Sequence, residues 1–160
     1  MSNFLVPLYS YKYYGMNFFE FKRNIKYGLT YGFLLGLIVF LIRYYFVSIG
    51  MDCFKYSGIT YDSLILYPII AIVQEIVVKG YAQTFLVTTF KGMKYSKFIA
   101  TLISALLFAK YHIIFGVIVT LLTFFFGIVT GYIYEKTHSV VGVSIMHIIV
   151  DWVLLLGVKL

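Results

Sequence analysis

In Ile72-Val73-Gln74-Glu75-Ile76-Val77-Val78-Lys79-Gly80, a carboxylate and an ammonium group interrupt an otherwise apolar run. Two later apolar runs also contain ionisable residues. Phe108-Ala109-Lys110-Tyr111-His112 ends in a histidine, and His147-Ile148-Ile149-Val150-Asp151 carries a histidine and an aspartate. A charge at the centre of a bilayer costs about 2.5–3.5 kcal/mol on insertion scales, so it is kept only where it faces protein or water. We therefore expect a polar site inside a membrane protein.

The composition agrees with a membrane location. The 160 residues are 62% hydrophobic and 12% charged, with a mean hydropathy of +0.94, whereas soluble domains carry about 25% charged residues. The net charge of +7 comes from cations that cluster between apolar runs. That distribution is typical of a protein in a lipid bilayer and argues against a nucleic-acid-binding surface. The length predicts a single membrane domain over 1–160.

Five apolar runs approach the roughly 20 residues that a helix needs to cross a bilayer. They are roughly 27–49, 62–89, 97–115, 117–134 and 140–157. The aromatic and basic residues 1–26 predict an interfacial segment ahead of them. The expected fold is all-α, a multi-span transmembrane helical bundle of about five spans. Gly28, Gly32 and Gly36 recur every four residues, which favours close packing between helices of this chain over a dimer interface.

The cations are distributed unevenly between the two sides of such a bundle. With the N-terminus inside, the cytoplasmic segments hold Lys12, Lys22, Arg23, Lys26, Lys91, Lys94, Lys97 and Lys136. The external segments hold only Lys55 and Lys159. This bias predicts a multi-pass protein of the cell membrane with a cytoplasmic N-terminus and an external C-terminus.

The three polar clusters are expected to lie at one depth. Glu75, His112 and Asp151 each lie roughly 20–22 Å from the inner end of their predicted helices, at about 1.5 Å per residue. Glu75 and Lys79 are four residues apart and so share a helix face where they can pair, as do His147 and Asp151. We therefore expect one buried site. The alternative is that each cluster only locks neighbouring helices together.

The order and spacing of these motifs resemble the intramembrane CAAX-protease and bacteriocin-processing family, also called the CPBP or Abi family. Its members include proteins similar to CAAX prenyl protease 2 and lysostaphin resistance protein A. They carry Glu-Glu-x-x-x-Arg-Gly, Phe-x-x-x-His and His-x-x-x-Asn or His-x-x-x-Asp on successive membrane helices. The resemblance covers residues 60–160 and marks them as a catalytic core. It implies an intramembrane endopeptidase whose partner is a membrane-associated protein or peptide, including prenylated CAAX-type substrates, cleaved by an activated water.

The resemblance also implies roles for individual residues. It places Glu75, His112, His147 and Asp151 in the catalytic site, with Gln74 and Lys79 in support. In the family, the first glutamate and the first histidine activate the water, and the second glutamate pairs with the arginine. The last histidine and its partner stabilise the oxyanion. This chain has Gln74 in place of the first glutamate and Lys79 in place of the arginine. Its own chemistry leaves two possible bases, Glu75 and His112.

Other chemistries stay open at this point. The expected mechanism uses no cofactor, but Glu75, His112, His147 and Asp151 are all legitimate zinc ligands. Against zinc, the chain has no His-Glu-x-x-His helix, and Lys79 disfavours a nearby cation. Because Gln74 removes a carboxylate, the alternative function is an inactive family relative that acts as a bacteriocin-immunity or regulatory membrane protein. A proton-coupled transporter is disfavoured because the short chain shows no paired inverted repeats.

Overall fold

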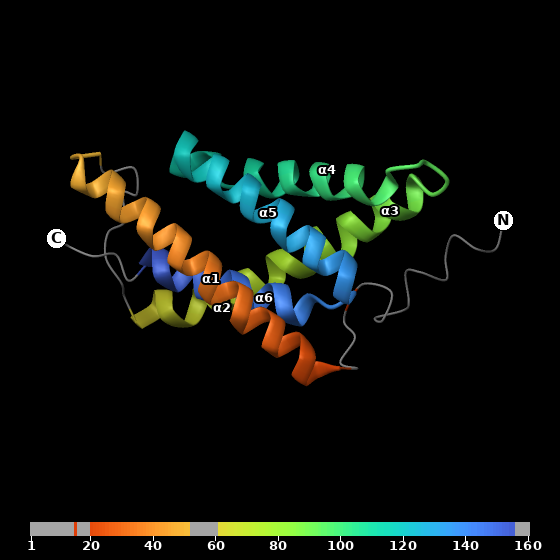
Figure 1. Ribbon diagram of the computed structural model, residues 1–160, viewed down its shortest axis with the longest axis horizontal. Helices are drawn as coiled ribbons and strands as arrows, with labels where there is room; N and C mark the ends of the chain where they lie inside the picture. The colour runs from red at the N-terminus through yellow and green to blue at the C-terminus, as the bar shows by residue number, and fades with distance from the viewer. Residues whose placement is uncertain (1–14, 16–19, 52–60, 156–160) are drawn as a thin grey trace.

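The computed structural model describes residues 15, 20–51 and 61–155, and its regular elements are all helical (Figure 1). They are α1 (Phe21–Ser48), α2 (Tyr61–Glu75), α3 (Thr84–Thr89), α4 (Ser96–Lys110), α5 (Val117–Thr137) and α6 (Val140–Leu155). A π-helical segment, Ile76–Gln83, joins α2 to α3, and a short 3-10 turn, Ile113–Phe115, precedes α5. The predicted all-α membrane bundle is confirmed. Most of the predicted interfacial segment 1–26 lies outside the described residues, and α1 already begins at Phe21.

Within the part of the chain that the structure describes, three helices are long and apolar enough to cross a membrane: Phe21–Ser48, Leu64–Thr89 and Val117–Thr137. The predicted run 97–115 is too long, because α4 ends at Lys110 after 15 residues. There the backbone N–H groups of Tyr111 and His112 donate to the carbonyls three residues earlier, which tightens the last turn. The chain then turns through Gly116, whose φ of 100° favours glycine, into α5.

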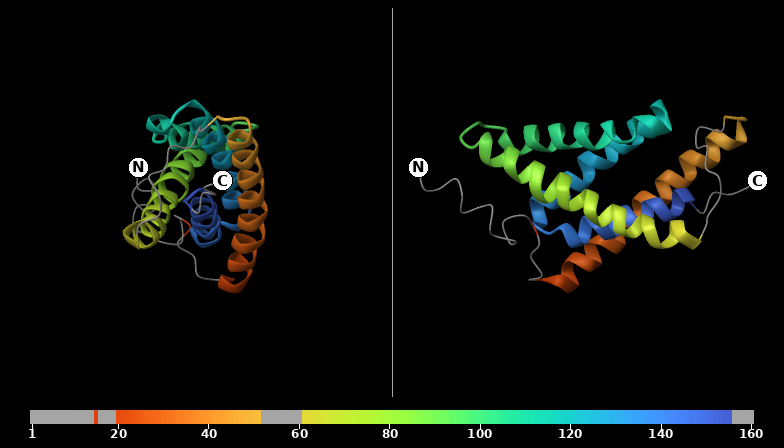
Figure 2. Two further views of the ribbon diagram at one scale, coloured as in Figure 1. Left: turned by 90° about the vertical axis from the view of Figure 1, so that its left-hand side faces the viewer. Right: turned by 180° about the vertical axis from the view of Figure 1, so that it is seen from behind.

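The last helix, α6, lies at the centre of the bundle. It packs most extensively against α1 on one side and also contacts α2 on the other, while α4 packs along α5. Figure 2 shows α6 between α1 and the long rod formed by α2, the π-helical segment and α3. Side chains of α6 therefore face several helices at once, as expected of a helix that carries part of a buried site.

Glycines bring α1 and α6 into close contact. A Cβ atom on Gly28 would lie 2.7 Å from the backbone oxygen of Gly142, and one on Gly32 would lie 2.8 Å from the side chain of Ile149. Gly36 continues the same seam one turn further along α1. Small residues permit this approach between membrane helices. The glycine spacing thus serves packing within the chain, as predicted.

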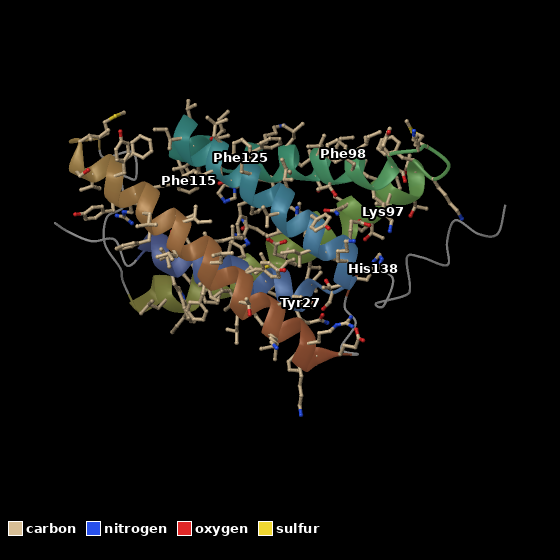
Figure 3. All side chains as sticks on the ribbon, in the orientation of Figure 1. Tyr27, Lys97, Phe98, Phe115, Phe125 and His138 are labelled. Atoms are coloured by element: carbon tan, nitrogen blue, oxygen red, sulfur yellow. The ribbon has the colours of Figure 1, made fainter. Side chains whose placement is uncertain are left out.

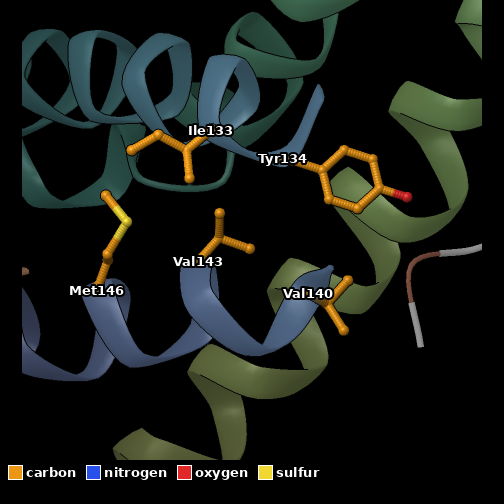
Figure 4. Packing of buried hydrophobic residues seen from close by; sticks show 5 residues of the cluster. All are labelled: Ile133, Tyr134, Val140, Val143 and Met146. Atoms are coloured by element: carbon orange, nitrogen blue, oxygen red, sulfur yellow. The ribbon is translucent and has the colours of Figure 1, made fainter. Parts of the chain in front are cut away.

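An apolar cluster between α5 and α6 forms the clearest core. It consists of Ile133, Tyr134, Val140, Val143 and Met146 (Figure 4). Polar side chains are buried beside it, whereas many large apolar side chains face outward: Phe33 is 65% exposed and Ile65 is 67% exposed. This distribution is that of a bundle whose outer surface contacts lipid and whose polar groups must find partners inside.

Candidate active site

A cavity of about 260 Å³ lies within the bundle, with walls from α1, α2, α4, α5 and α6. Four of the polar residues singled out from the sequence line it: Gln74, His112, His147 and Asp151. The remaining wall is mostly apolar and aromatic. Residues from three separate sequence motifs thus share one cavity, in the arrangement expected for a single site.

His147 lies between two carboxylates. Its Nδ1 is 3.0 Å from Oε1 of Glu75, and its Nε2 is 3.5 Å from Oδ2 of Asp151. His147 is 3% exposed and Glu75 is 1% exposed, while the side chain of Asp151 is 21% exposed. Among the carboxylates of the described residues, Asp151 alone lines the cavity. Glu75 therefore contacts the site through His147 instead of reaching the cavity itself.

His112 lies just after the C-terminal end of α4. Its Nδ1 lies 2.9 Å from the carbonyl oxygen of Phe108, one turn earlier. The Phe108 ring also contacts both histidines, with centroid distances of 4.8 Å to His112 and 5.2 Å to His147. The phenylalanine of the Phe-x-x-x-His motif thus serves as a spacer that sets the two imidazoles on one side of the cavity.

Lys79 has a different partner from the one predicted. Its Nζ donates a 2.7 Å hydrogen bond to the backbone oxygen of Gly127 in α5, and Glu75 lies against His147. The π-helical segment begins directly after Glu75, and its wider turns change the direction in which the following side chains point. Lys79 consequently tethers this segment to α5, and its hydrogen bond goes to this backbone oxygen instead of to Glu75.

A second buried polar network was not predicted from the sequence. Nε2 of Gln83 lies 3.0–3.2 Å from Oγ1 of Thr101, the backbone oxygen of Gly131 and Oε1 of Glu135. Oγ of Ser104 donates a 3.0 Å bond to Oε1 of Gln83. This network ties the end of the π-helical segment to α4 and α5. The one available signal was that Gln83 follows Lys79 by four residues within an apolar run.

The described residues hold no group of three or more histidine, cysteine, aspartate and glutamate side chains arranged for a metal ion. In the zinc set considered from the sequence, Nδ1 of His112 faces a backbone carbonyl and Nδ1 of His147 faces Glu75. The arrangement at hand is one of acid–base and hydrogen-bonding groups around a cavity.

The family described as type II CAAX prenyl endopeptidase Rce1-like matches residues 56–153. This range includes Gln74, Glu75, Lys79, His112, His147 and Asp151. No curated protein and no solved structure matches the chain.

Proposed function

The chain belongs to the Rce1-like family of type II CAAX prenyl endopeptidases, and we propose that it hydrolyses a peptide bond in a membrane-associated protein or peptide. One observation carries the proposal: His112, His147 and Asp151 line a single cavity inside a helical membrane bundle. The mostly apolar remainder of that cavity suits a substrate that partitions into the membrane. A prenylated CAAX-type segment has this chemistry.

In the proposed reaction, His112 is the general base. A carbonyl oxygen can only accept a hydrogen bond, so the nitrogen facing the Phe108 oxygen, Nδ1, carries the hydrogen. In the neutral ring, Nε2 then has a free lone pair and can take a proton from water. The water attacks the carbonyl carbon of the scissile peptide bond. His112 later returns the proton to the leaving amine as the C–N bond breaks.

His147 is proposed to stabilise the oxyanion that forms in this step. Glu75 faces its Nδ1 and holds the ring in place. Between two carboxylates, His147 is proposed to be the imidazolium, in which both ring nitrogens carry a hydrogen. The 3.5 Å between Nε2 and Asp151 is long for a hydrogen bond, so the N–H at Nε2 is available to the carbonyl oxygen of the substrate. A preorganised donor of this kind is worth about 10²–10³ in kcat.

Gln74 occupies the cavity wall where the family has its first glutamate. An amide cannot remove a proton, but it can accept a hydrogen bond from the attacking water and donate one to the substrate. We therefore assign Gln74 the orientation of water and leave proton transfer to His112.

Gln74 also supports a second candidate function. If the missing carboxylate is indispensable, the chain is an inactive relative whose cavity binds a peptide without cleaving it, as an immunity or regulatory protein of the membrane would. The intact set of Glu75, His112, His147 and Asp151 favours the enzyme, because a site without catalysis has little need of two histidines, one of them flanked by carboxylates.

Turnover of a quenched library of membrane peptides, prenylated and unprenylated, by the purified protein in detergent separates the two functions. We expect wild type to cleave. His112→Ala should reduce kcat by about 10²-fold or more, the usual contribution of a general base, whereas Gln74→Ala should reduce it less. The same cleavage measurement with a chelator present tests whether activity requires a metal ion.

Failure of the wild type to cleave, combined with activity in Gln74→Glu, would establish the inactive relative. Full activity in His112→Ala would exclude the proposed base.

A further inference from the structure

A second polar cavity lies at the other end of α1, remote from the candidate active site. It has a volume of about 350 Å³ and is lined by Arg23, Tyr27, Tyr31, Tyr132, Lys136 and Thr137. An adjoining cavity shares Arg23 and the two α1 tyrosines and adds Lys26. Arg23 precedes Val39, the α1 residue in the active-site cavity, by about 24 Å of helix. This basic cavity is therefore separate from the proposed catalytic groups.

Positive charge dominates the basic cavity. Arg23, Lys26 and Lys136 all contribute to its walls or to those of the adjoining cavity. Glu20 pairs with Arg23, and both side chains are about half exposed, so this ion pair is weak and readily exchanged. Glu135, the acidic neighbour of Lys136, faces Gln83 and Lys97 instead. Three cations against one exposed carboxylate leave a site that attracts an anion.

Tyrosines line the basic cavity beside these cations. The Tyr27 and Tyr31 rings are stacked, with centroids 6.0 Å apart and planes 15° apart. Nζ of Lys136 lies 5.4 Å from the centre of the Tyr132 ring, within the range of a cation–π interaction. Guanidinium, ammonium and phenol groups together offer several hydrogen-bond donors. Phosphate oxygens are strong acceptors for such donors, and arginine binds them in a bidentate manner.

The cavity lies at the ends of two apolar helices, where lipid head groups are expected. Arg23 and Lys26 stand at the start of the apolar span of α1, and Lys136 stands at the end of α5. Figure 3 shows Tyr27 on α1 near the end of α5 that His138 follows. Beyond the tyrosines, α1 exposes Phe33, Leu34 and Leu37, a surface along which acyl chains can lie. Tyrosine and basic residues are typical of this interfacial zone.

We propose that this basic cavity binds the phosphate of an anionic phospholipid head group, with the acyl chains along the exposed face of α1. Basic pockets between membrane helices bind anionic head groups in this way. A free phosphate ion would use the same donors, so the test separates the two sources.

The probe is phosphatidylglycerol, titrated onto the purified full-length protein in phosphatidylcholine nanodiscs and followed by native mass spectrometry. We expect wild type to retain phosphatidylglycerol over phosphatidylcholine. Arg23→Gln/Lys136→Gln should lower the apparent affinity for it by about tenfold or more, since two cations that attract the anionic head group are lost. Lys22→Gln/Lys94→Gln is the matched control, because it removes two exposed cations outside the basic cavity and should retain the preference.

Arg23→Lys/Lys136→Arg keeps both charges and should also retain the lipid. If this variant also loses the lipid, the loss comes from misfolding and not from the missing charges. Equal losses in the two glutamine variants would overturn the proposal, because the effect would then be general electrostatic attraction. Retention of inorganic phosphate in place of phosphatidylglycerol would overturn the assignment to a lipid.

Discussion

Among the contacts in the candidate active site, the one between Glu75 and His147 matters most for the proposed reaction. Glu75 is buried and does not line the cavity, yet it lies 3.0 Å from the imidazole that does. A carboxylate in this position fixes the orientation of the ring and stabilises its positive charge. It acts on the reaction through His147, so we regard Glu75 as a positioning residue.

Glu75→Gln is therefore expected to reduce kcat by about 10²-fold, the lower range for removing preorganised electrostatic stabilisation. KM should change little, because Glu75 does not line the cavity that the substrate would occupy. Steady-state kinetics on one membrane peptide measure both. Glu135→Gln is the matched control, since it also neutralises a largely buried carboxylate but lies in the Gln83 network. Wild-type kcat in Glu75→Gln would contradict this role.

Among the elements, the π-helical segment Ile76–Gln83 does most to shape the interior. It starts beside Glu75, and its two long polar side chains, Lys79 and Gln83, bond to the backbone oxygens of Gly127 and Gly131 on α5. Gly131 leaves room for both side chains, because a Cβ there would lie 2.8 Å from Oε1 of Gln83 and 3.2 Å from Nζ of Lys79. Hydrogen bonds from Lys79 and Gln83 thus join the π-helical segment to α5 inside the bundle.

Replacing Gln83 with methionine should destabilise the fold. The change keeps the volume but leaves buried oxygen and hydroxyl groups without partners, at about 1–3 kcal/mol for each unsatisfied group. Thermal unfolding in detergent should show a clearly lowered midpoint. Gln74→Met makes the same exchange on the wall of the active-site cavity and should leave the midpoint almost unchanged. Equal midpoints for the two variants would show that the Gln83 network adds no stability.

The glycine seam between α1 and α6 allows a graded test of packing. A Cβ on Gly28 would lie 2.7 Å from the backbone oxygen of Gly142, whereas one on Gly36 would lie 3.2 Å from the Val153 side chain, which can move. We expect Gly28→Ala to cost about 1–3 kcal/mol, as overpacking does, and Gly36→Ala to cost less. Unfolding midpoints of the two variants measure the difference, and the reverse order would contradict the packing described.

The sequence predicted the structure well where the polarity of a side chain determines whether it faces lipid or the interior. Hydropathy predicted the helical bundle, and the cost of burying charge predicted one interior site with Glu75, His112, His147 and Asp151. His112, His147 and Asp151 do line one cavity, whereas Glu75 lies behind His147. The partners of Lys79 and Gln83 were not predictable in this way. Both bond to backbone oxygens, which every residue carries, and Gln83 also bonds to side chains of α4 and α5. The π-helical turns that direct them there have no side-chain signature. The end of α4 at Lys110 was missed because the apolar pattern continues through Phe115.

For the whole molecule, orientation in the membrane decides from which side a substrate and a lipid reach their sites. The cation distribution supports our proposal that the N-terminus is cytoplasmic. Lys94, in the turn before α4, and the basic cavity would then face the cytoplasm.

Cysteine labelling of intact cells tests this orientation. With Cys53 replaced by serine, a cysteine at position 94 should be shielded from a membrane-impermeant thiol reagent. A cysteine at position 55 should react, because the external segments are predicted to include it. Permeabilised cells, in which both positions should react, are the control. Labelling of position 94 but not of position 55 in intact cells would reverse the orientation.

The pairing of α1 with α6 has a consequence for how the protein is made. Roughly 90 residues separate these helices, so at 5–20 residues per second α1 waits roughly 5–20 s for its partner to emerge from the ribosome. During that interval the glycine face of α1 and its Asn24, both buried in the finished fold, have no α6 to cover them. A chain that stalls before Val140 would therefore leave this polar and backbone-rich stripe of α1 uncovered in the bilayer.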